Sequence, residues 1–190
     1  MSWISGNYYL NTAEMENNAQ LVADYAAAHG WTRTACCAIL GNMQAESGIN
    51  PGIWENLTPY YGGYGLVQWT PYTKYSTWAT GEGYTWQDNG DAEMERISYE
   101  AANNIQWFTN AELGIPPPCT FEQFLKDDLY DLQDSTNFWL WFYEHPADPG
   151  PTTQALRYSY AQYWDSYIDW HGLTIPVWLL FKFNDWRRFR

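Results

Sequence analysis

The first part of the chain repeats apolar positions with the period of an α-helix. Asn-Thr-Ala-Glu at the start of residues 11–29 is a capping box, in which two side chains bond the first free N–H groups of a helix. Gly30 follows as a residue that tolerates the left-handed conformation at a helix end. A second helix is predicted over residues 32–47, and Gly48 ends it in the same way.

The next stretch, residues 49–69, breaks this period. It is rich in Pro and Gly and closes on Leu-Val-Gln-Trp, which predicts a loop followed by a short strand or hairpin. The helical period then returns, and further helices are expected over 71–80, 88–108, a short stretch from 120, 135–144 and 152–167. The pattern predicts an α+β fold that is predominantly α-helical, with one small β-hairpin.

Length and composition fit one compact domain. The chain has 190 residues, of which 46% are hydrophobic and 16% charged, so it can build a core. We assign residues 1–170 to this domain and 171–190 to a tail that is first apolar and then basic. The 13 Trp, 16 Tyr and 8 Phe are more rings than such a domain can bury, and flat exposed rings suit sugars.

Acidic residues dominate the charge, with 22 Asp and Glu against 9 Lys and Arg and a net charge of −13. This balance argues against nucleic-acid binding, which needs basic patches, and against electrostatic attachment to anionic membranes. The longest apolar run, 173–181, is about half the ~20 residues of a membrane-spanning helix. The start lacks a secretory leader pattern, so we expect synthesis in the cytoplasm with reduced thiols at Cys36, Cys37 and Cys119.

One carboxylate lies where the second helix should be apolar. An apolar stripe runs along this helix, and its continuation leads to Glu46 and Ser47. Burial and the negative end of the helix dipole both disfavour an ionised group, so we expect a raised pKa for Glu46. An acid that keeps its proton can protonate the leaving oxygen of a glycosidic bond. The alternative is a side chain that turns into solvent.

Rings and one amide follow Glu46 within about 25 residues: Trp54, Tyr60, Tyr61, Tyr64, Gln68 and Trp69. Because a strand alternates its faces, Gln68 would share one side with Leu66, and Trp69 the other side with Val67. An amide flanked by rings can bond a sugar hydroxyl or acetamido group. The alternative is a core hairpin in which the Gln68 amide bonds the backbone.

Two segments together resemble a known family. Gly41–Gly52 (Gly-Asn-Met-Gln-Ala-Glu-Ser-Gly-Ile-Asn-Pro-Gly) and Gly63–Thr70 (Gly-Tyr-Gly-Leu-Val-Gln-Trp-Thr) are similar to the phage tail-tip lysozyme domain. That domain belongs to the lysozyme-like group, with goose-type lysozymes and lytic transglycosylases. Its catalytic Glu-Ser at a helix end matches Glu46-Ser47, and its Gly-Leu-Met-Gln hairpin matches Gly65–Gln68. The resemblance covers roughly residues 3–169.

The resemblance implies a lysozyme-like fold and a peptidoglycan-degrading glycosidase. Its substrate would be the β-1,4 bond between N-acetylmuramic acid and N-acetylglucosamine, with Glu46 as the catalytic acid. Residues expected to hold or flank the glycan are Gln68, Tyr64, Trp69, Trp54 and Ser47. The expected setting is a phage virion-associated tail lysin that is made in the bacterial cytoplasm without a signal peptide and acts at the cell wall.

Two departures from the family pattern matter. Larger tail-tip proteins of this kind can carry a zinc endopeptidase half, but the histidines here have no ligand-like spacing: His29, His145 and His171. We therefore expect no metal and no cofactor. His145 stands where the family pattern has Arg, and we expect neighbouring Glu144 to pair with Arg157, with direct substrate contact as the alternative.

The second carboxylate of the mechanism stays open. Asp88, Asp91 and Glu55 are candidates to position water or support the oxocarbenium charge, although Asp91 fits a helix N-cap equally well. None is obligatory if the substrate's own hydroxyl attacks. The alternatives are a lytic transglycosylase and a non-catalytic wall-binding or structural tail module. For Glu46→Gln we expect loss of wall cleavage with a thermal midpoint that stays level or rises.

The tail, residues 171–190, lies outside the resemblance. It combines eight large apolar residues with three Arg. It either packs on the domain, docks on a phage tail protein or another copy of the chain, or lies weakly on a membrane. We favour docking over membrane contact, and packing on the domain is given the same weight as these two alternatives together. Because the tail lies outside the resemblance, deletion of residues 172–190 should spare glycan cleavage.

Overall fold

The computed structural model describes residues 1–110 and 114–170, so the predictions for residues 171–190 lie outside the described residues. The described part is 56% helix and 2% strand. Its elements in chain order are α1 (Thr12–Ala28), α2 (Arg33–Ser47), the 3₁₀ turn η1 (Glu55–Leu57), α3 (Thr73–Gly81), α4 (Gly90–Ala102), α5 (Phe121–Lys126), α6 (Leu132–Trp139), the π-helical turn η2 (Leu140–Glu144) and α7 (Pro151–Tyr167).

The capping signals in the sequence lie at the helix ends. Asn11 and Glu14 form the predicted capping box of α1, and the Thr32 side chain accepts from the third backbone N–H of α2. Gly48 ends α2 in the left-handed conformation, with φ 61°. The helix predicted over 88–108 is shorter than expected, because α4 starts after its N-cap Asn89 and ends at Ala102.

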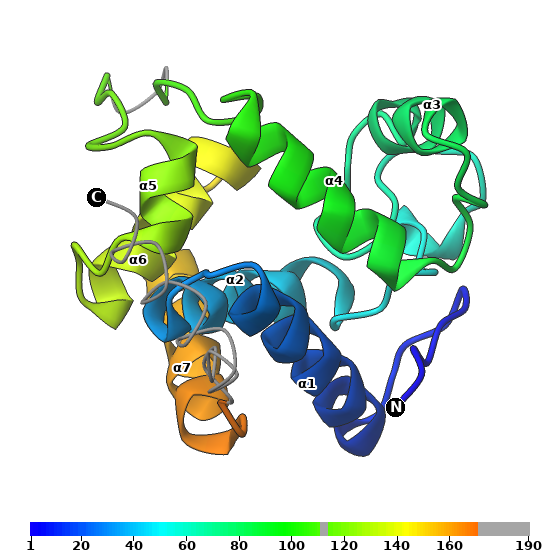
Figure 1. Ribbon diagram of the computed structural model, residues 1–190, viewed down its shortest axis with the longest axis horizontal. Coiled ribbons are helices and arrows are strands. Elements are labelled where there is room, and N and C mark those ends of the chain that lie inside the picture. Colours follow the sequence, from blue (N-terminus) through cyan, green and yellow to red (C-terminus); the bar gives the residue numbers. More distant parts are fainter. Residues whose placement is uncertain (111–113, 171–190) are drawn as a thin grey trace, which may run out of the picture.

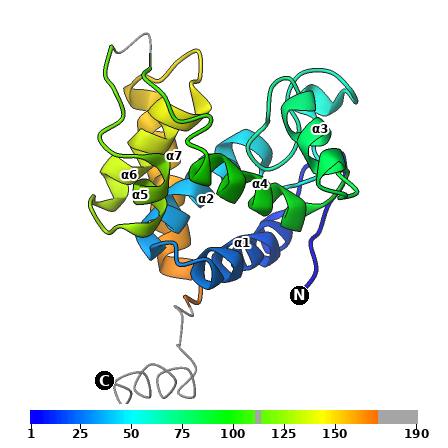
Figure 2. The same ribbon diagram turned by 45° about the horizontal axis from the view of Figure 1, so that its top comes forward.

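Helix α2 runs through the middle of the molecule, with α1 on one side and α6 and α7 on another (Figures 1 and 2). A glycine explains how closely α7 approaches it. A Cβ added to Gly41 would lie 2.6 Å from the backbone oxygen of Arg157 and 2.7 Å from the nitrogen of Ala161. The side chain of Asn42 is also buried and donates to the backbone oxygens of Ala38 and Thr136. These contacts fix the direction in which the last turn of α2 points.

The predicted β-hairpin is wrong. Trp54 and Tyr64 form only an isolated bridge, and the chain then turns back on itself with positive φ at Gly65 and Gln68. Side chains take over the hydrogen bonds of a strand ladder, because Glu93 accepts from the Leu66 backbone and the Gln68 amide donates to backbone oxygens. A folded loop therefore replaces the strand, and the expected alternation fails: Leu66, Val67 and Trp69 are all buried.

An N-terminal arm, residues 2–9, lies along the loop that follows α2. The buried side chain of Asn50 donates to the backbone oxygens of Gly6 and Tyr8 at 2.8 and 2.7 Å. Asn7 completes the attachment, because it accepts from the Trp54 backbone at 3.1 Å and donates to the Leu57 oxygen at 3.0 Å. The arm is thus held by side-chain bonds to backbone groups, which fixes its course beside the loop.

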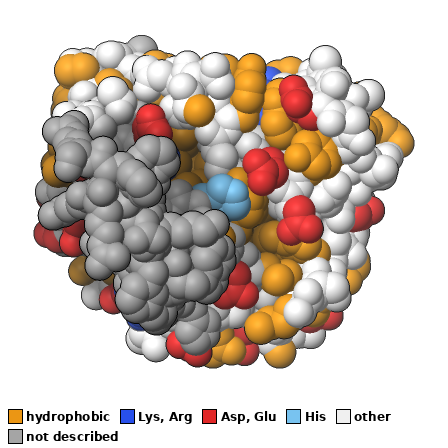
Figure 3. All heavy atoms as spheres, in the orientation of Figure 1, with side chains coloured by type: hydrophobic (Ala, Val, Ile, Leu, Met, Phe, Trp, Pro, Cys, Tyr) orange, Lys and Arg blue, Asp and Glu red, His pale blue; other side chains and the backbone are white. Residues whose placement is uncertain are grey.

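Acidic side chains are spread over the face of the molecule seen in Figure 3, with very little Lys or Arg among them, as the net charge of −13 predicts. Of the helices that the structure describes, none is both long and apolar enough to cross a membrane. Cys36 and Cys37 are buried in α2, Cys119 is half-buried, and all three are free thiols.

Candidate active site

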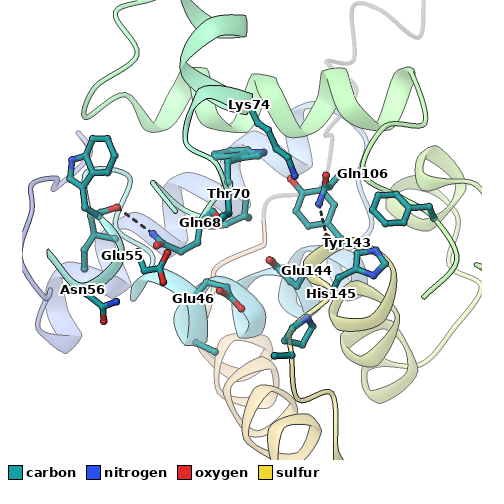
Figure 4. A pocket seen from close by; sticks show the side chains of 18 of the residues that line it. Glu46, Glu55, Asn56, Gln68, Thr70, Lys74, Gln106, Tyr143, Glu144 and His145 are labelled. Carbon is teal, nitrogen blue, oxygen red and sulfur yellow. Dashed lines mark hydrogen bonds between the residues drawn. The ribbon is translucent and has the colours of Figure 1, made fainter. Parts of the chain in front are cut away.

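A cleft of about 1020 Å³ opens beside the C-terminal end of α2. Its base includes Glu46. One side is formed by residues 53–56 and 67–70, and the other by residues 106, 108, 109 and 143–147 (Figure 4). Tyr9 from the N-terminal arm also lines it. This volume is at the upper end of the range for ligand sites, so the cleft has room for an extended molecule.

Glu46 projects from the last turn of α2 into this cleft and does not simply turn into bulk solvent. Its side chain is 22% exposed, and its Oε1 accepts from the guanidinium of Arg157, which is 8% exposed. Arg157 is held in turn by the Asn42 side chain at 3.1 Å. Among the described residues, the second carboxyl oxygen of Glu46 has no hydrogen-bond partner, so it is available to a ligand.

Glu144 lines the same cleft from the end of η2. The expected Glu144–Arg157 ion pair is replaced, because Arg157 binds Glu46 instead. Trp139 donates its indole N–H to Oε1 of Glu144 at 2.6 Å. Burial raises the pKa of Glu144 well above its usual range, and the nearby Glu46 carboxylate raises it further.

Of the three candidates for a second carboxylate, Glu55 lines the cleft, whereas Asp88 and Asp91 do not. Glu55 lines the cleft on the side opposite Glu144, and its Oε2 accepts from the Gly63 backbone at 2.9 Å. Asp91 is outside the cleft lining and accepts from the Trp3 indole at 2.8 Å, so it is not the N-cap that the sequence also allowed. Asp88 likewise accepts from Ser5.

Two residues expected to touch the glycan bond the backbone instead. Ser47 is buried and donates to the Leu66 oxygen at 2.8 Å, which ties α2 to the loop that follows the isolated bridge. The Gln68 amide lines the cleft, but it donates to the oxygens of Ile53 at 3.2 Å and Gly65 at 3.0 Å. Both side chains therefore hold the wall of the cleft in place.

The predicted aromatic residues form a packed cluster behind this wall. Trp54 and Trp69 line the cleft but are nearly buried, and the buried Tyr64 accepts from the Asp88 backbone through its hydroxyl. The ring centroids of Trp54 and Tyr64 are 4.7 Å apart. The cleft offers exposed rings at Tyr9, at 74% exposure, and at Phe108, at 50%, and the sequence reasoning missed both.

Two buried carboxyl groups of α4 were also missed. Glu93 is fully buried and accepts from the Leu66 backbone at 2.7 Å, and a Cβ at Gly65 would lie 2.5 Å from it. Glu100 accepts from Trp69 at 3.2 Å and from Tyr143 at 2.6 Å, so it joins the two sides of the cleft. Burial raises the pKa of both carboxyl groups. Their spacing of seven residues puts both on one face of the helix together with Ile97, and this spacing was the available signal.

Comparison with known proteins identifies the family to which this chain belongs. The sequence profile of the phage tail lysozyme family matches residues 17–168. The chain is also 41% identical over 172 residues to "Morphogenesis protein 1" of Bacillus phage B103, an alignment that covers 90% of this chain and 44% of that protein. The chain thus spans less than half the length of this relative. The matched region contains Glu46, Glu144 and the loop, residues 53–70, that carries Trp54, Tyr64 and Trp69. The chain therefore belongs to the phage tail lysozyme family.

Proposed function

We propose that this chain is a peptidoglycan glycosidase that cleaves the β-1,4 bond between N-acetylmuramic acid and N-acetylglucosamine, with Glu46 as the general acid. The observation that carries the proposal is the position of Glu46, at the end of a rigidly packed helix and at the base of a large cleft, with one carboxyl oxygen free. Membership of a family of phage tail lysozymes supports the substrate class.

In this reaction Glu46 gives its proton to the glycosidic oxygen as the C–O bond breaks. The positive charge that develops on the sugar ring is stabilised by the acidic surroundings, and Glu55 faces it from the other side of the cleft. Water then attacks the anomeric carbon in a hydrolase. In a lytic transglycosylase, the sugar's own hydroxyl attacks and leaves a 1,6-anhydro ring.

The cleft also has a platform for sugar at its edge. Tyr9 presents an exposed ring on the N-terminal arm, whose backbone is fixed by Asn50. A tyrosine ring with an apolar face and a polar edge can stack on a pyranose ring. We place the glycan along the cleft from Glu46 towards Tyr9, in the direction of the loop that carries Trp54.

A non-catalytic tail module is the second candidate, because the phage relative is named a morphogenesis protein. Such a module would bind wall fragments without shortening them. The proposed virion setting also includes residues 171–190 as a docking segment for phage tail proteins. Deletion of residues 172–190 should then change the oligomeric or tail-bound state and spare glycan cleavage.

The deciding experiment digests purified peptidoglycan with the wild-type chain and Glu46→Gln, and identifies the muropeptides by mass. General-acid catalysis contributes roughly 10²–10⁴-fold, so cleavage should fall by that factor in the variant. Glu122→Gln is the matched control, because Glu122 is an exposed carboxylate on α5 that pairs with Lys126. Equal release by wild type and Glu46→Gln would refute the role of Glu46, and no release by the wild type would favour the binding module.

A further inference from the structure

A general acid needs a proton before the reaction, yet Glu46 is bound by a guanidinium. Arg157 contacts Glu46 directly, and it is itself buried and oriented by Asn42. One oxygen of Glu46 is therefore held by a cation before any substrate binds. A neighbouring group that holds a proton beside Glu46 would supply the acid, and the residue placed for that task is Glu144.

The two carboxyl groups have matching surroundings. Each has one oxygen held by a fixed donor, Arg157 for Glu46 and the Trp139 indole for Glu144. Each has its other oxygen without a hydrogen-bond partner in the described part of the chain. Both line the same cleft, and Figure 4 shows their carboxyl groups next to each other at its base. One of the two is thus paired with a cation and the other with a neutral donor.

Two carboxylates this close cannot both ionise without repulsion, so such a pair tends to keep one proton between its members. We propose that Glu46 and Glu144 share one proton, and that Glu144 is a positioning residue that keeps it within the pair. This inference rests on the proposed glycosidase function and deepens it. It explains how a carboxyl group bound to Arg157 can still deliver a proton.

The chemical step balances without another reactant. Glu46 passes its proton to the leaving oxygen, which takes the electron pair of the broken C–O bond. The nucleophile, either water or the sugar hydroxyl, loses its proton to the Glu46 carboxylate as it attacks the anomeric carbon. The proton that leaves is the one that the pair shares, so both carboxyl groups are ionised until the proton of the nucleophile restores the pair. Arg157 on Glu46 and the Trp139 indole on Glu144 offset this charge in the meantime.

Other charged groups surround Glu144 and have to be considered in any pH experiment. These groups are Glu46 on α2, Glu100 with its partner Arg96 on α4, and Arg157 on α7. Tyr143 and His145 are the chain neighbours of Glu144. The charge of Glu100 is offset by donors, because Arg96, Trp69 and Tyr143 all bond it. Glu46 is therefore the carboxylate whose removal should affect Glu144 most.

The first test does not depend on activity. ¹³C-labelled glutamate carboxyl groups are titrated by NMR in the wild type, Glu46→Gln and Glu144→Gln. Glu46→Gln removes the neighbouring negative charge, so the resonance of Glu144 should titrate at least about one pH unit lower. Glu122→Gln is the control and should leave this resonance unchanged. An unmoved Glu144 titration in Glu46→Gln would overturn the shared proton, whether or not the chain cleaves glycan.

The second test uses the pH dependence of peptidoglycan cleavage. Glu144→Gln keeps an oxygen that can accept from Trp139, so a purely structural role would be preserved. If the proton is shared, the alkaline limb of the activity profile should move to lower pH by about one unit, and Glu144→Asp should restore it. An unchanged profile would refute the proposal. Activity that is abolished at every pH would also refute it, because Glu144 would then be the direct proton donor.

Discussion

Replacement of Gln68 by Ala distinguishes a glycan-binding amide from a structural one. The substitution removes two hydrogen bonds, to the oxygens of Ile53 and Gly65. Each of these oxygens keeps one other donor, because Gly65 N–H bonds Ile53 and Gln68 N–H bonds Gly65. Neither oxygen is left wholly unsatisfied, so each lost bond costs about 0.5–1 kcal/mol, and the free energy of unfolding should fall by about 1–2 kcal/mol.

Urea unfolding followed by circular dichroism measures this loss. With a typical m-value of about 2 kcal/mol/M, the midpoint should move down by about 0.5–1 M with no change in m. Gln133→Ala is the matched control, since Gln133 is exposed on α6 and its loss should change stability by less than about 0.5 kcal/mol.

The same samples are tested for glycan cleavage below the unfolding transition. If Gln68 only holds the loop, the remaining folded protein should cleave peptidoglycan at a rate within a few-fold of the wild type. A variant with an unchanged urea midpoint and a large loss of glycan affinity would refute the structural reasoning and restore the amide as a binding group.

Three further predictions follow from particular contacts. Glu46→Gln should lower the free energy of unfolding by about 1–3 kcal/mol, contrary to the sequence-based expectation, because it leaves the buried Arg157 guanidinium without its counter-charge; thermal melting measures this. Tyr9→Ala should weaken the binding of long glycan fragments to Glu46→Gln protein by several-fold in calorimetry, whereas Tyr8→Ala, on the same arm but outside the cleft lining, should not. Burial raises the pKa of Glu93, so the native state binds this proton more tightly than the unfolded state, whose pKa is near 4.5, and stability should fall as pH rises above that value. Glu93→Gln should flatten this dependence in melts from pH 4 to 9, and a parallel slope in both proteins would contradict the burial argument.

Local signals in the sequence were sufficient for most of the helices. The capping box at Asn11 and the left-handed glycine at Gly48 act over three or four residues, so they can be recognised without the rest of the fold. The same holds for Glu46, whose place at the end of an apolar stripe follows from the helical period alone. Its location in a cleft is what the tertiary structure adds.

The segment after α2 shows where local reasoning fails. Leu66, Val67 and Trp69 have the composition of a strand, but the backbone of Leu66 bonds side chains from elsewhere, Glu93 on α4 and Ser47 on α2. No pattern within the segment records that partner. A strand was therefore predicted where a glycine-dependent loop is packed against a buried carboxyl group.

The sequence by itself determined the helices, their caps, the acidic character and the family motif around Glu46, because each depends on neighbours along the chain. Only the tertiary structure decided the partners of the charged groups. It placed Arg157 on Glu46, and it brought Glu144 to the cleft from almost a hundred residues further along the chain. Charge pairing depends on distances in space and on burial, and both are set by the packing of α2 against α6 and α7.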